Sequence, residues 1–338
     1  MKAVGLTRYL PIDDPQSLLD VELPDPKPSG HDLLVRVEAV SVNPVDTKVR
    51  APKAPVEAQP KVLGYDAAGV VAAVGTEVTL FKPGDAVWYA GDVTRPGTNQ
   101  QLHLVDERVV GCKPKTLDFA QSSALPLTAL TAWELLFDRF RFDPSGADAG
   151  RSLLVIAGAG GLGSIAIQLG RLAGLEVIAT ASRPETIDWC KRMGAAHVVD
   201  HRQPLRPQLE AIGHKHVDAI GCFTAAEGYW AQMADLVAPQ GQIGLVVGLR
   251  EKLDLELLKN KSASVHWEFM FTRSMFRTKD IARQHEILNR VAALVDAGKL
   301  RTTWTRTLGA IDATNLREAH RQLESGTTIG KVVLAGWS

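Results

Sequence analysis

The chain has 338 residues, of which 45% are hydrophobic and 22% are charged, a composition typical of globular enzymes. Lys and Arg together count 38, and Asp and Glu together also count 38, so the formal net charge is zero. This balance disfavours a nucleic-acid binder, which usually carries a basic surplus, and the length predicts about two domains.

The N-terminal residues contain no basic region followed by an apolar stretch, so no signal peptide is predicted. The sequence contains no run of about 18 apolar residues, so no membrane span is predicted. The chain contains three cysteines, Cys112, Cys190 and Cys222, which are widely spaced and odd in number. A disulfide framework is therefore not expected, and a reducing cytoplasm is the expected location.

The first 125 or so residues predict a β-rich module. Short alternating or β-branched runs occur at residues 33–42, 67–74, 86–90 and 101–105, and Pro and Gly separate them. Residues 51–60 contain three prolines, which predict an exposed loop.

Beyond Asp118, helix-length segments alternate with short apolar runs, a pattern typical of an α/β fold with a doubly wound parallel sheet. The predicted strands are residues 152–157, 176–180, 197–199, 217–221 and 242–247, with helices at 162–173 and 185–193. An amphipathic helix then runs to residue 297. A strand at 302–308, a helix at 313–324 and a final strand at 331–334 follow it.

A glycine-rich turn follows the strand predicted at residues 152–157. Gly158, Gly160 and Gly163 match the spacing G-x-G-x-x-G, with Gly161 and Leu162 between the last two glycines. In dinucleotide-binding turns the first glycine makes a tight turn, the second lets the backbone approach a pyrophosphate, and the third lets helix and strand pack closely. The helix N-terminus then offers free N–H groups to the phosphates. Such turns also occur for structural reasons alone, but the flanking strand and helix favour a dinucleotide site.

The end of the next predicted strand distinguishes NADH from NADPH. NAD sites usually place an Asp or Glu there for the ribose 2′-hydroxyl, whereas this chain has Ser182 and Arg183 and no acid. Both side chains can donate hydrogen bonds to a 2′-phosphate, which predicts NADPH as the cofactor. A helix N-cap at Ser182, with Pro184 as the first helical residue, is the structural alternative, and both interpretations can hold together.

Several ordered motifs along the whole chain resemble the medium-chain dehydrogenase/reductase superfamily. The similarity is to its zinc-less quinone oxidoreductase branch, and especially to bacterial zinc-type alcohol dehydrogenase-like proteins. The motifs are Val42-Asn43-Pro44-Val45-Asp46, Gly64-Tyr65-Asp66-Ala67-Ala68-Gly69, Phe81-Lys82-Pro83-Gly84-Asp85-Ala86-Val87, Pro126-Leu127-Thr128-Ala129-Leu130-Thr131-Ala132, the glycine turn, Met193-Gly194-Ala195-Ala196 and Gly330-Lys331-Val332-Val333-Leu334.

The resemblance implies a GroES-like β-rich catalytic domain formed by residues 1–125 and 272–338. A Rossmann NADP-binding domain, residues 126–271, is inserted between the two parts, and the active-site cleft lies between the domains. It also implies a homodimer formed through the edge of the Rossmann sheet.

The same resemblance implies that this chain binds no zinc. Zinc-dependent members hold a catalytic zinc ion with a Cys near position 43 and a His and a Glu near positions 65 and 66, where this chain has Asn43, Tyr65 and Asp66. A single carboxylate lacks the three protein ligands that catalytic zinc needs. The four cysteines of their structural zinc site have no counterpart in residues 91–103. His214 and His216 lie in a predicted solvated loop, with a surface metal contact as the less favoured interpretation.

By resemblance, Asn43 and Asp46 lie beside the nicotinamide. Asn43 would donate to the acceptor carbonyl and Asp46 would order the loop, although an Asx turn at Asn43 is an alternative. Tyr65 would offer a hydroxyl donor in the cleft, or would simply pack at the domain edge. Lys331, in the closing strand, would reach the cofactor, or would be an ordinary edge-strand lysine.

The remaining predicted contacts also come from the resemblance. Thr128 and Thr131 would contact the nicotinamide ribose or the phosphates, with helix capping as the alternative. Val247 and Gly248 end the last predicted Rossmann strand and would meet the nicotinamide amide. His201 would lie against the adenine ribose phosphate.

Phe269 and Phe271 would line an aromatic acceptor pocket, although such clusters are also common in cores and dimer contacts. Together these residues predict an NADPH-dependent oxidoreductase that transfers hydride to a small quinone or enone without a metal ion. A 2-enoyl-thioester reductase is one alternative. An NADPH-binding redox sensor or crystallin-like structural protein is the non-enzyme alternative.

Overall fold

The computed structural model describes residues 1–338, and the chain forms two compact units. Unit 1 consists of Met1–Leu130 and Phe271–Ser338, and unit 2 consists of Thr131–Met270. Unit 1 is therefore assembled from the two ends of the chain. Each unit has its own hydrophobic core, as expected for a domain.

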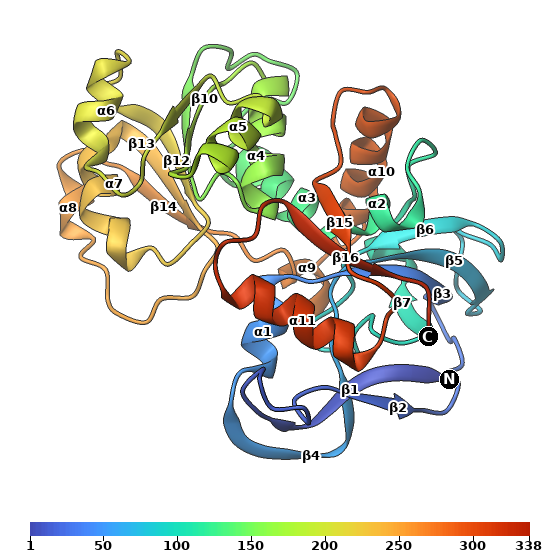
Figure 1. Cartoon of the computed structure of the whole chain (residues 1–338). Helices are drawn as coiled ribbons and strands as arrows, with labels where there is room; N and C mark the ends of the chain where they lie inside the picture. The colour runs from blue at the N-terminus through green and yellow to red at the C-terminus, as the bar shows by residue number, and fades with distance from the viewer. The chain divides into compact units, whose positions relative to one another are not determined.

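Unit 1 is built mainly from antiparallel strands (Figure 1). One sheet has the order β2-β1-β4, and a seven-stranded sheet has the order β15-β16-β3-β5-β6-β8, with β7 also paired to β3. The strands are β1 (Lys2–Tyr9), β2 (Leu19–Glu22), β3 (Asp32–Ser41), β4 (Lys53–Val62), β5 (Ala67–Val74), β6 (Ala86–Tyr89), β7 (Leu102–Asp106), β8 (Val110–Cys112), β15 (Trp304–Thr307) and β16 (Lys331–Ala335).

Five helices cover these sheets or lead into them, and a sixth, α3, crosses the boundary between the units. They are α1 (Pro44–Arg50), α2 (Phe119–Ser123), α3 (Pro126–Trp133), α9 (Thr272–Met275), α10 (Arg283–Asp296) and α11 (Ala313–Glu324), with a 3₁₀ turn at Glu107–Val109. Alternate residues of β3, including Leu33, Val35 and Val37, are buried in the main core. This period of two is what a strand with one covered face requires.

The prediction of a loop at residues 51–60 is wrong, because most of this segment belongs to strand β4. Strand β4 lies at the edge of its sheet and pairs only with β1, with shifts in register along the pair. An edge strand tolerates Pro55 and Pro60 because one side of its backbone needs no ladder hydrogen bond. The prolines therefore mark the position of the strand in the sheet and not the absence of a strand.

Unit 2 contains a six-stranded parallel sheet with the order β11-β10-β9-β12-β13-β14. This is the order 3-2-1-4-5-6 of a Rossmann fold, so the α/β class and the doubly wound parallel sheet predicted from the sequence are confirmed. The strands are β9 (Ser152–Ile156), β10 (Glu176–Thr180), β11 (His197–Val199), β12 (Val217–Cys222), β13 (Val237–Leu245) and β14 (Ser264–Trp267). Every residue of β9 is buried, as expected for a central strand covered on both faces.

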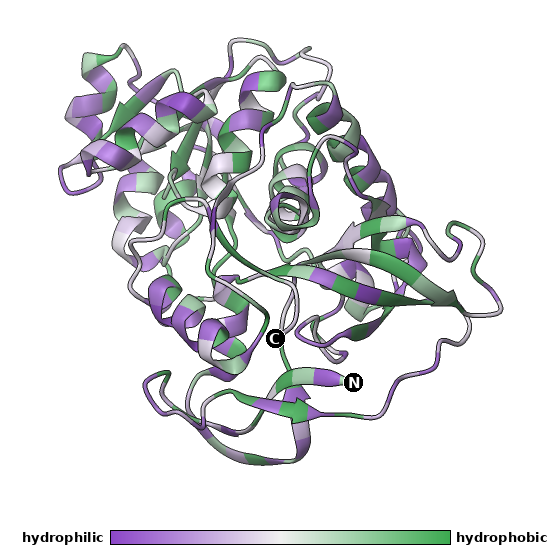
Figure 2. Ribbon diagram, turned by 45° about the vertical axis from the view of Figure 1, so that its right-hand side comes forward, coloured by the Kyte–Doolittle hydropathy of each residue, from purple (hydrophilic) through white to green (hydrophobic).

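Helices flank this sheet, with α4 and α5 on one side and α6 and α7 on the other (Figure 1). They are α4 (Gly161–Leu172), α5 (Pro184–Met193), α6 (Leu205–Ala211), α7 (Trp230–Leu236) and α8 (Glu256–Lys259), with a π-helical turn at Glu134–Arg139 and a 3₁₀ turn at Glu227–Tyr229. Figure 2 shows helices that carry both hydrophilic and hydrophobic residues, as surface helices over a core do.

Two details of unit 2 differ from the prediction. Strand β13 ends at Leu245, so Val247 and Gly248 lie beyond the strand and do not form its end. The sixth strand, β14, was not predicted, because its four residues, SVHW, are half exposed and show no apolar run. None of the helices combines the length and the apolar character that a membrane span requires.

Candidate active site

The ammonium group of Lys331 lies among three oxygen atoms in unit 1. Its Nζ donates to the Val42 carbonyl at 2.9 Å, to Asn43 Oδ1 at 2.5 Å and to Asp66 Oδ2 at 2.9 Å. The side chains of Lys331 and Asp66 are 5% and 0% exposed. All three N–H bonds of the ammonium group are therefore used inside a dry site.

Asp66 links the strands that meet at this point. Its Oδ2 also accepts hydrogen bonds from the Ser41 hydroxyl at 3.0 Å and from the Asn43 amide nitrogen at 2.7 Å, and its Oδ1 accepts the Leu127 N–H at 2.7 Å. A buried carboxylate is stable only with such partners. Asp66 thereby joins β3, the start of α1, the start of α3 and β16 around one negative charge.

Asn43 is held by the same network. Its amide nitrogen also lies 3.4 Å from the Tyr65 carbonyl, so both amide hydrogens and the amide oxygen have partners within unit 1. This arrangement favours a positioning role for Asn43 over donation to an acceptor. Lys331 is no edge-strand lysine, because β16 pairs with β15 on one side and with β3 on the other.

Asp46, in the first turn of α1, accepts the Asn43 N–H at 2.6 Å through Oδ2. Its side chain is buried, and burial raises the pKa of Asp46 to about 7. The hydrogen bond from Asn43 and the charge of Lys331 favour the ionised carboxylate, but burial outweighs them. Near neutral pH, Asp46 therefore exchanges a proton beside the Lys331 network.

Tyr65 is buried, and its hydroxyl makes no hydrogen bond within the structure. Its ring lies edge-on to that of Phe271, with 5.5 Å between the ring centroids. Burial, and then the charges of Asp46 and Asp92, raise the pKa of Tyr65. The phenol thus stays protonated at neutral pH and offers a hydrogen-bond donor next to an aromatic wall.

These residues do not fit a zinc ion. Nowhere in residues 1–338 do three or more His, Cys, Asp or Glu side chains come together in a way that could hold a metal. The oxygen atoms of Asn43 and Asp66 face the Lys331 ammonium group, whose positive charge would repel a metal cation. Catalytic zinc needs about three protein ligands of the N, S or carboxylate type, and this site has one carboxylate.

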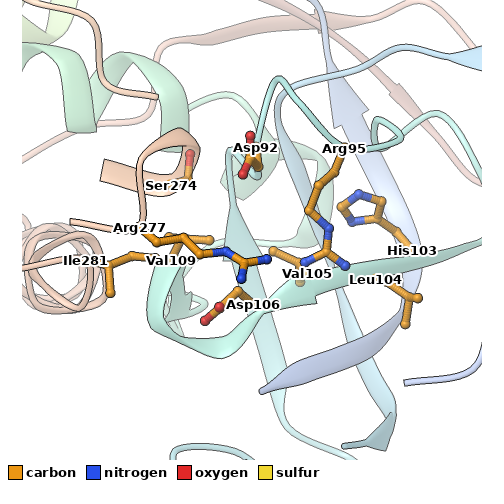
Figure 3. Close-up of a pocket in the computed structure, with 10 residues that line it drawn as sticks. All are labelled: Asp92, Arg95, His103, Leu104, Val105, Asp106, Val109, Ser274, Arg277 and Ile281. Atoms are coloured by element: carbon orange, nitrogen blue, oxygen red, sulfur yellow. The ribbon is translucent and has the colours of Figure 1, made fainter. Parts of the chain in front are cut away.

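A small pocket elsewhere in unit 1 is lined by residues of the β6–β7 connection, strand β7 with the 3₁₀ turn after it, and α9 with the segment after it (Figure 3). Arg95 and Arg277 both extend into it. Arg95 is paired with Asp32 at 2.8 Å, and Asp106 is paired with Arg108 at 2.6 Å. Two of its four charged side chains, Arg95 and Asp106, are thus already compensated. The pocket matters here because Asp92, one of its walls, acts on Tyr65.

The glycine turn of unit 2 has the close contacts expected for a dinucleotide site. A Cβ atom on Gly163 would lie 2.4 Å from the Ala157 carbonyl oxygen, and one on Gly158 would lie 2.8 Å from the Ala179 Cβ. A Cβ on Gly160 would meet nothing closer than 3.8 Å, so its backbone faces open space. Gly161 and Leu162 open helix α4, where the first-turn N–H groups have no partner within the helix.

One detail of this turn was not foreseen. The residue in the left-handed region is Ala157, with a φ of 68°, and not Gly158. The Ala157 N–H donates to Thr180 Oγ1 at 3.0 Å, which helps to hold this unfavourable conformation. Position 158 needs a glycine because a Cβ atom there would be too close to Ala179 and Cys190, and not because of the backbone conformation of the turn.

Ser182 and Arg183 follow β10, as the sequence predicts. The N-cap of α5 is Arg183, so the suggested cap at Ser182 is wrong by one residue. The Arg183 guanidinium lies 3.1 Å from Glu185. His201 is half-buried in the segment after β11. Arg202, next to it, is not among the predicted residues, but its guanidinium donates to the Ser182 carbonyl just after β10.

The other predicted residues are more dispersed. Thr128 is buried, and its hydroxyl donates to the Leu125 carbonyl at 3.0 Å, a contact at the start of α3. Thr131 lies one turn later on the same helix and is also buried. Phe269 belongs to unit 2 and is 45% exposed, whereas Phe271 belongs to unit 1 and is buried against Tyr65.

Comparison with known families matches two parts of the chain. Residues 29–120 match the alcohol dehydrogenase GroES-like domain, and residues 193–334 match the family described as zinc-binding dehydrogenase. The GroES-like β domain expected from the sequence is thereby confirmed.

Similar proteins cover the whole chain. A zinc-type alcohol dehydrogenase-like protein of Staphylococcus epidermidis is 42% identical over 99% of both chains. A crystal structure from Rhizobium etli, provisionally assigned as a zinc-dependent alcohol dehydrogenase, is 53% identical, covers 100% of this chain and 98% of that chain, and has a TM-score of 0.95.

Two further comparisons concern reductases. The quinone oxidoreductase of Coxiella burnetii is 27% identical with a TM-score of 0.82, over 99% of both chains. A 2-methylene-furan-3-one reductase of Solanum lycopersicum is 36% identical over 60% of this chain and 52% of its own length.

Proposed function

Because this chain belongs to the medium-chain dehydrogenase/reductase superfamily, as a zinc-type alcohol dehydrogenase-like oxidoreductase, we propose that it uses NADPH to reduce a quinone or an enone without a metal ion. The observation that carries this proposal is the buried Tyr65, whose hydroxyl has no hydrogen-bond partner within the structure. Its main chain is held by the Asn43 amide and, through the neighbouring Asp66, by the Lys331 ammonium group. The names of the Coxiella and Solanum relatives support the same class of acceptor.

Unit 2 supplies the residues that would hold the cofactor. The open backbone at Gly160 and the N-terminus of α4 would bind the pyrophosphate, and Ser182 with Arg183 would bind the 2′-phosphate. When bound, the reduced nicotinamide would supply the hydride.

Unit 1 supplies the residues that would stabilise the acceptor. As hydride adds to a carbon conjugated with a carbonyl group, an electron pair moves onto the carbonyl oxygen. The Tyr65 hydroxyl can donate a hydrogen bond to that oxygen and then its proton, and solvent returns a proton to Tyr65. A quinone contains the same conjugated unit, so one site serves both acceptors.

The reverse reaction on a simple alcohol is less well supported. Alcohol oxidation in metal-dependent enzymes uses the metal to lower the pKa of the hydroxyl group. In this chain the corresponding cation is an ammonium group whose three hydrogens already have acceptors. An activated alkene or quinone needs only positioning and charge stabilisation.

The edge of the Rossmann sheet supports a homodimer. Strand β14 pairs only with β13, and Trp267 at its end is 51% exposed. An unpaired edge strand with an exposed aromatic side chain is suited to pairing with a second copy of the chain. Sedimentation of the purified protein, compared with a Trp267→Lys variant, tests this association.

The Tyr65→Phe variant tests the acceptor site. It keeps the ring against Phe271 and removes only the hydroxyl group. We expect kcat with NADPH and an enone to fall by about 10²-fold, while NADPH binding and the unfolding midpoint stay unchanged. An unchanged kcat would show that Tyr65 is not the donor. NADPH binding without turnover of any quinone, enone or enoyl thioester would instead favour the redox-sensor or structural alternative.

A further inference from the structure

Arg202 connects the tips of two neighbouring strands in unit 2. It follows β11, yet its Nη2 donates to the carbonyl oxygen of Ser182, just after β10, at 2.8 Å. Asp200 holds the same guanidinium through Nε at 3.1 Å and Nη2 at 2.8 Å. These contacts place a rigid, planar cation next to Ser182 and Arg183, which follow the second Rossmann strand.

The free part of this guanidinium faces outward. Nη1 makes no hydrogen bond in the structure, and the side chain is 61% exposed. Asp200 is therefore an anchor that occupies one edge of the guanidinium and leaves donors on the other. The hydrogen bonds from Arg202 lower the pKa of Asp200 to about 2, so this anchor stays ionised in the neutral range.

Arg183 is less well placed to act alone. Its Nε pairs with Glu185 at 3.1 Å, and its main chain caps α5 through Thr186. A phosphate group next to Ser182 would thus meet two guanidinium groups, one from each strand tip. Arginine is suited to this task because its planar donors match phosphate oxygens in pairs.

We propose that Arg202 is a specificity-determining residue that binds the 2′-phosphate of NADPH together with Ser182 and Arg183. This inference rests on the proposed NADPH site and adds to it a residue from the neighbouring strand. NADH has a hydroxyl group at that position, so Arg202 gives it no charge-assisted bond, and the preference for NADPH depends on both arginines.

The test measures binding of nucleotide fragments and does not need turnover. Adenosine 2′,5′-bisphosphate and AMP are titrated calorimetrically into the wild type and the Arg202→Gln, Arg202→Lys and Arg192→Gln variants. Arg192 is an exposed arginine at the other end of α5, so Arg192→Gln controls for the loss of one positive charge from the same unit.

We expect wild type and Arg192→Gln to bind the bisphosphate more tightly than AMP. Arg202→Gln should weaken bisphosphate binding by about 10-fold or more and leave AMP binding unchanged, because one charged hydrogen-bonding group is lost. Arg202→Lys should recover only part of the loss, since lysine cannot hold Asp200 and a phosphate as a planar fork does.

Bisphosphate binding that is equal in wild type and Arg202→Gln would overturn the inference, as would an equal loss for bisphosphate and AMP. A wild type that prefers the bisphosphate, with Arg202→Gln unaffected, would leave the proposed function intact and remove only the role of Arg202. A wild type that binds neither fragment would remove the nucleotide site itself and the proposed function with it.

Discussion

Replacement of Lys331 by methionine isolates the contribution of the buried ammonium group. Methionine keeps a side chain of similar length and apolar character, but it removes the cation that Val42, Asn43 and Asp66 surround. Asp66 would remain fully buried, with the Ser41 hydroxyl, the Asn43 amide and the Leu127 N–H as its neutral donors. The negative charge would then have no opposite charge to balance it.

The size of the effect follows from this burial. Removing one partner of a buried ion pair costs about 3–5 kcal/mol, because the remaining charge is left uncompensated. We expect the free energy of unfolding of unit 1 to fall by this amount in Lys331→Met. The double variant Lys331→Met/Asp66→Asn should lose less than the sum of the two single variants, since it leaves no unpaired charge.

Urea unfolding followed by tryptophan fluorescence measures these differences, with Lys299→Met as the control at an exposed lysine. A loss below about 1 kcal/mol for Lys331→Met, or strict additivity in the cycle, would refute the buried ion pair as described, because exposed pairs contribute no more than that.

Two further predictions concern the glycine turn and Asp46. Gly163→Ala should lower the free energy of unfolding of unit 2 by about 1–3 kcal/mol, because the added Cβ would lie 2.4 Å from a carbonyl oxygen. Gly160→Ala should leave the free energy of unfolding unchanged and weaken NADPH binding, as measured by fluorescence. For Asp46, the unfolded carboxyl loses its proton near pH 3.8 but the folded one keeps it to about pH 7. The free energy of unfolding of the wild type should therefore fall relative to that of Asp46→Asn as pH rises through this window. Urea unfolding at several pH values measures this difference. A difference that stays constant with pH would contradict the prediction.

The sequence predicted most of the strands because their apolar residues recur at short, regular intervals. The central strand β9 and the glycine turn after it depend on residues close together in the chain, so both could be predicted directly from the sequence. Strands β4 and β14 were missed because both lie at sheet edges, where prolines and exposed residues are tolerated.

The candidate site was harder to predict because its contacts join distant parts of the chain. Lys331 and Asp66 are 265 residues apart, and nothing in either local sequence indicates that they pair. Arg202 lies 20 residues beyond the Ser182 carbonyl that it contacts, and only the parallel arrangement of β10 and β11 brings the two together. Single residues could thus be identified as candidates from the sequence, but the residues that they contact could be identified only from the folded structure.

The most direct test of the central claim is the oxidation of NADPH by chelator-treated protein, followed by the loss of NADPH absorbance with a panel of quinones and enones. We expect turnover that the chelator does not reduce, that added zinc does not increase, and that is faster with NADPH than with NADH. Turnover that is lost on chelation and restored by zinc would contradict this claim.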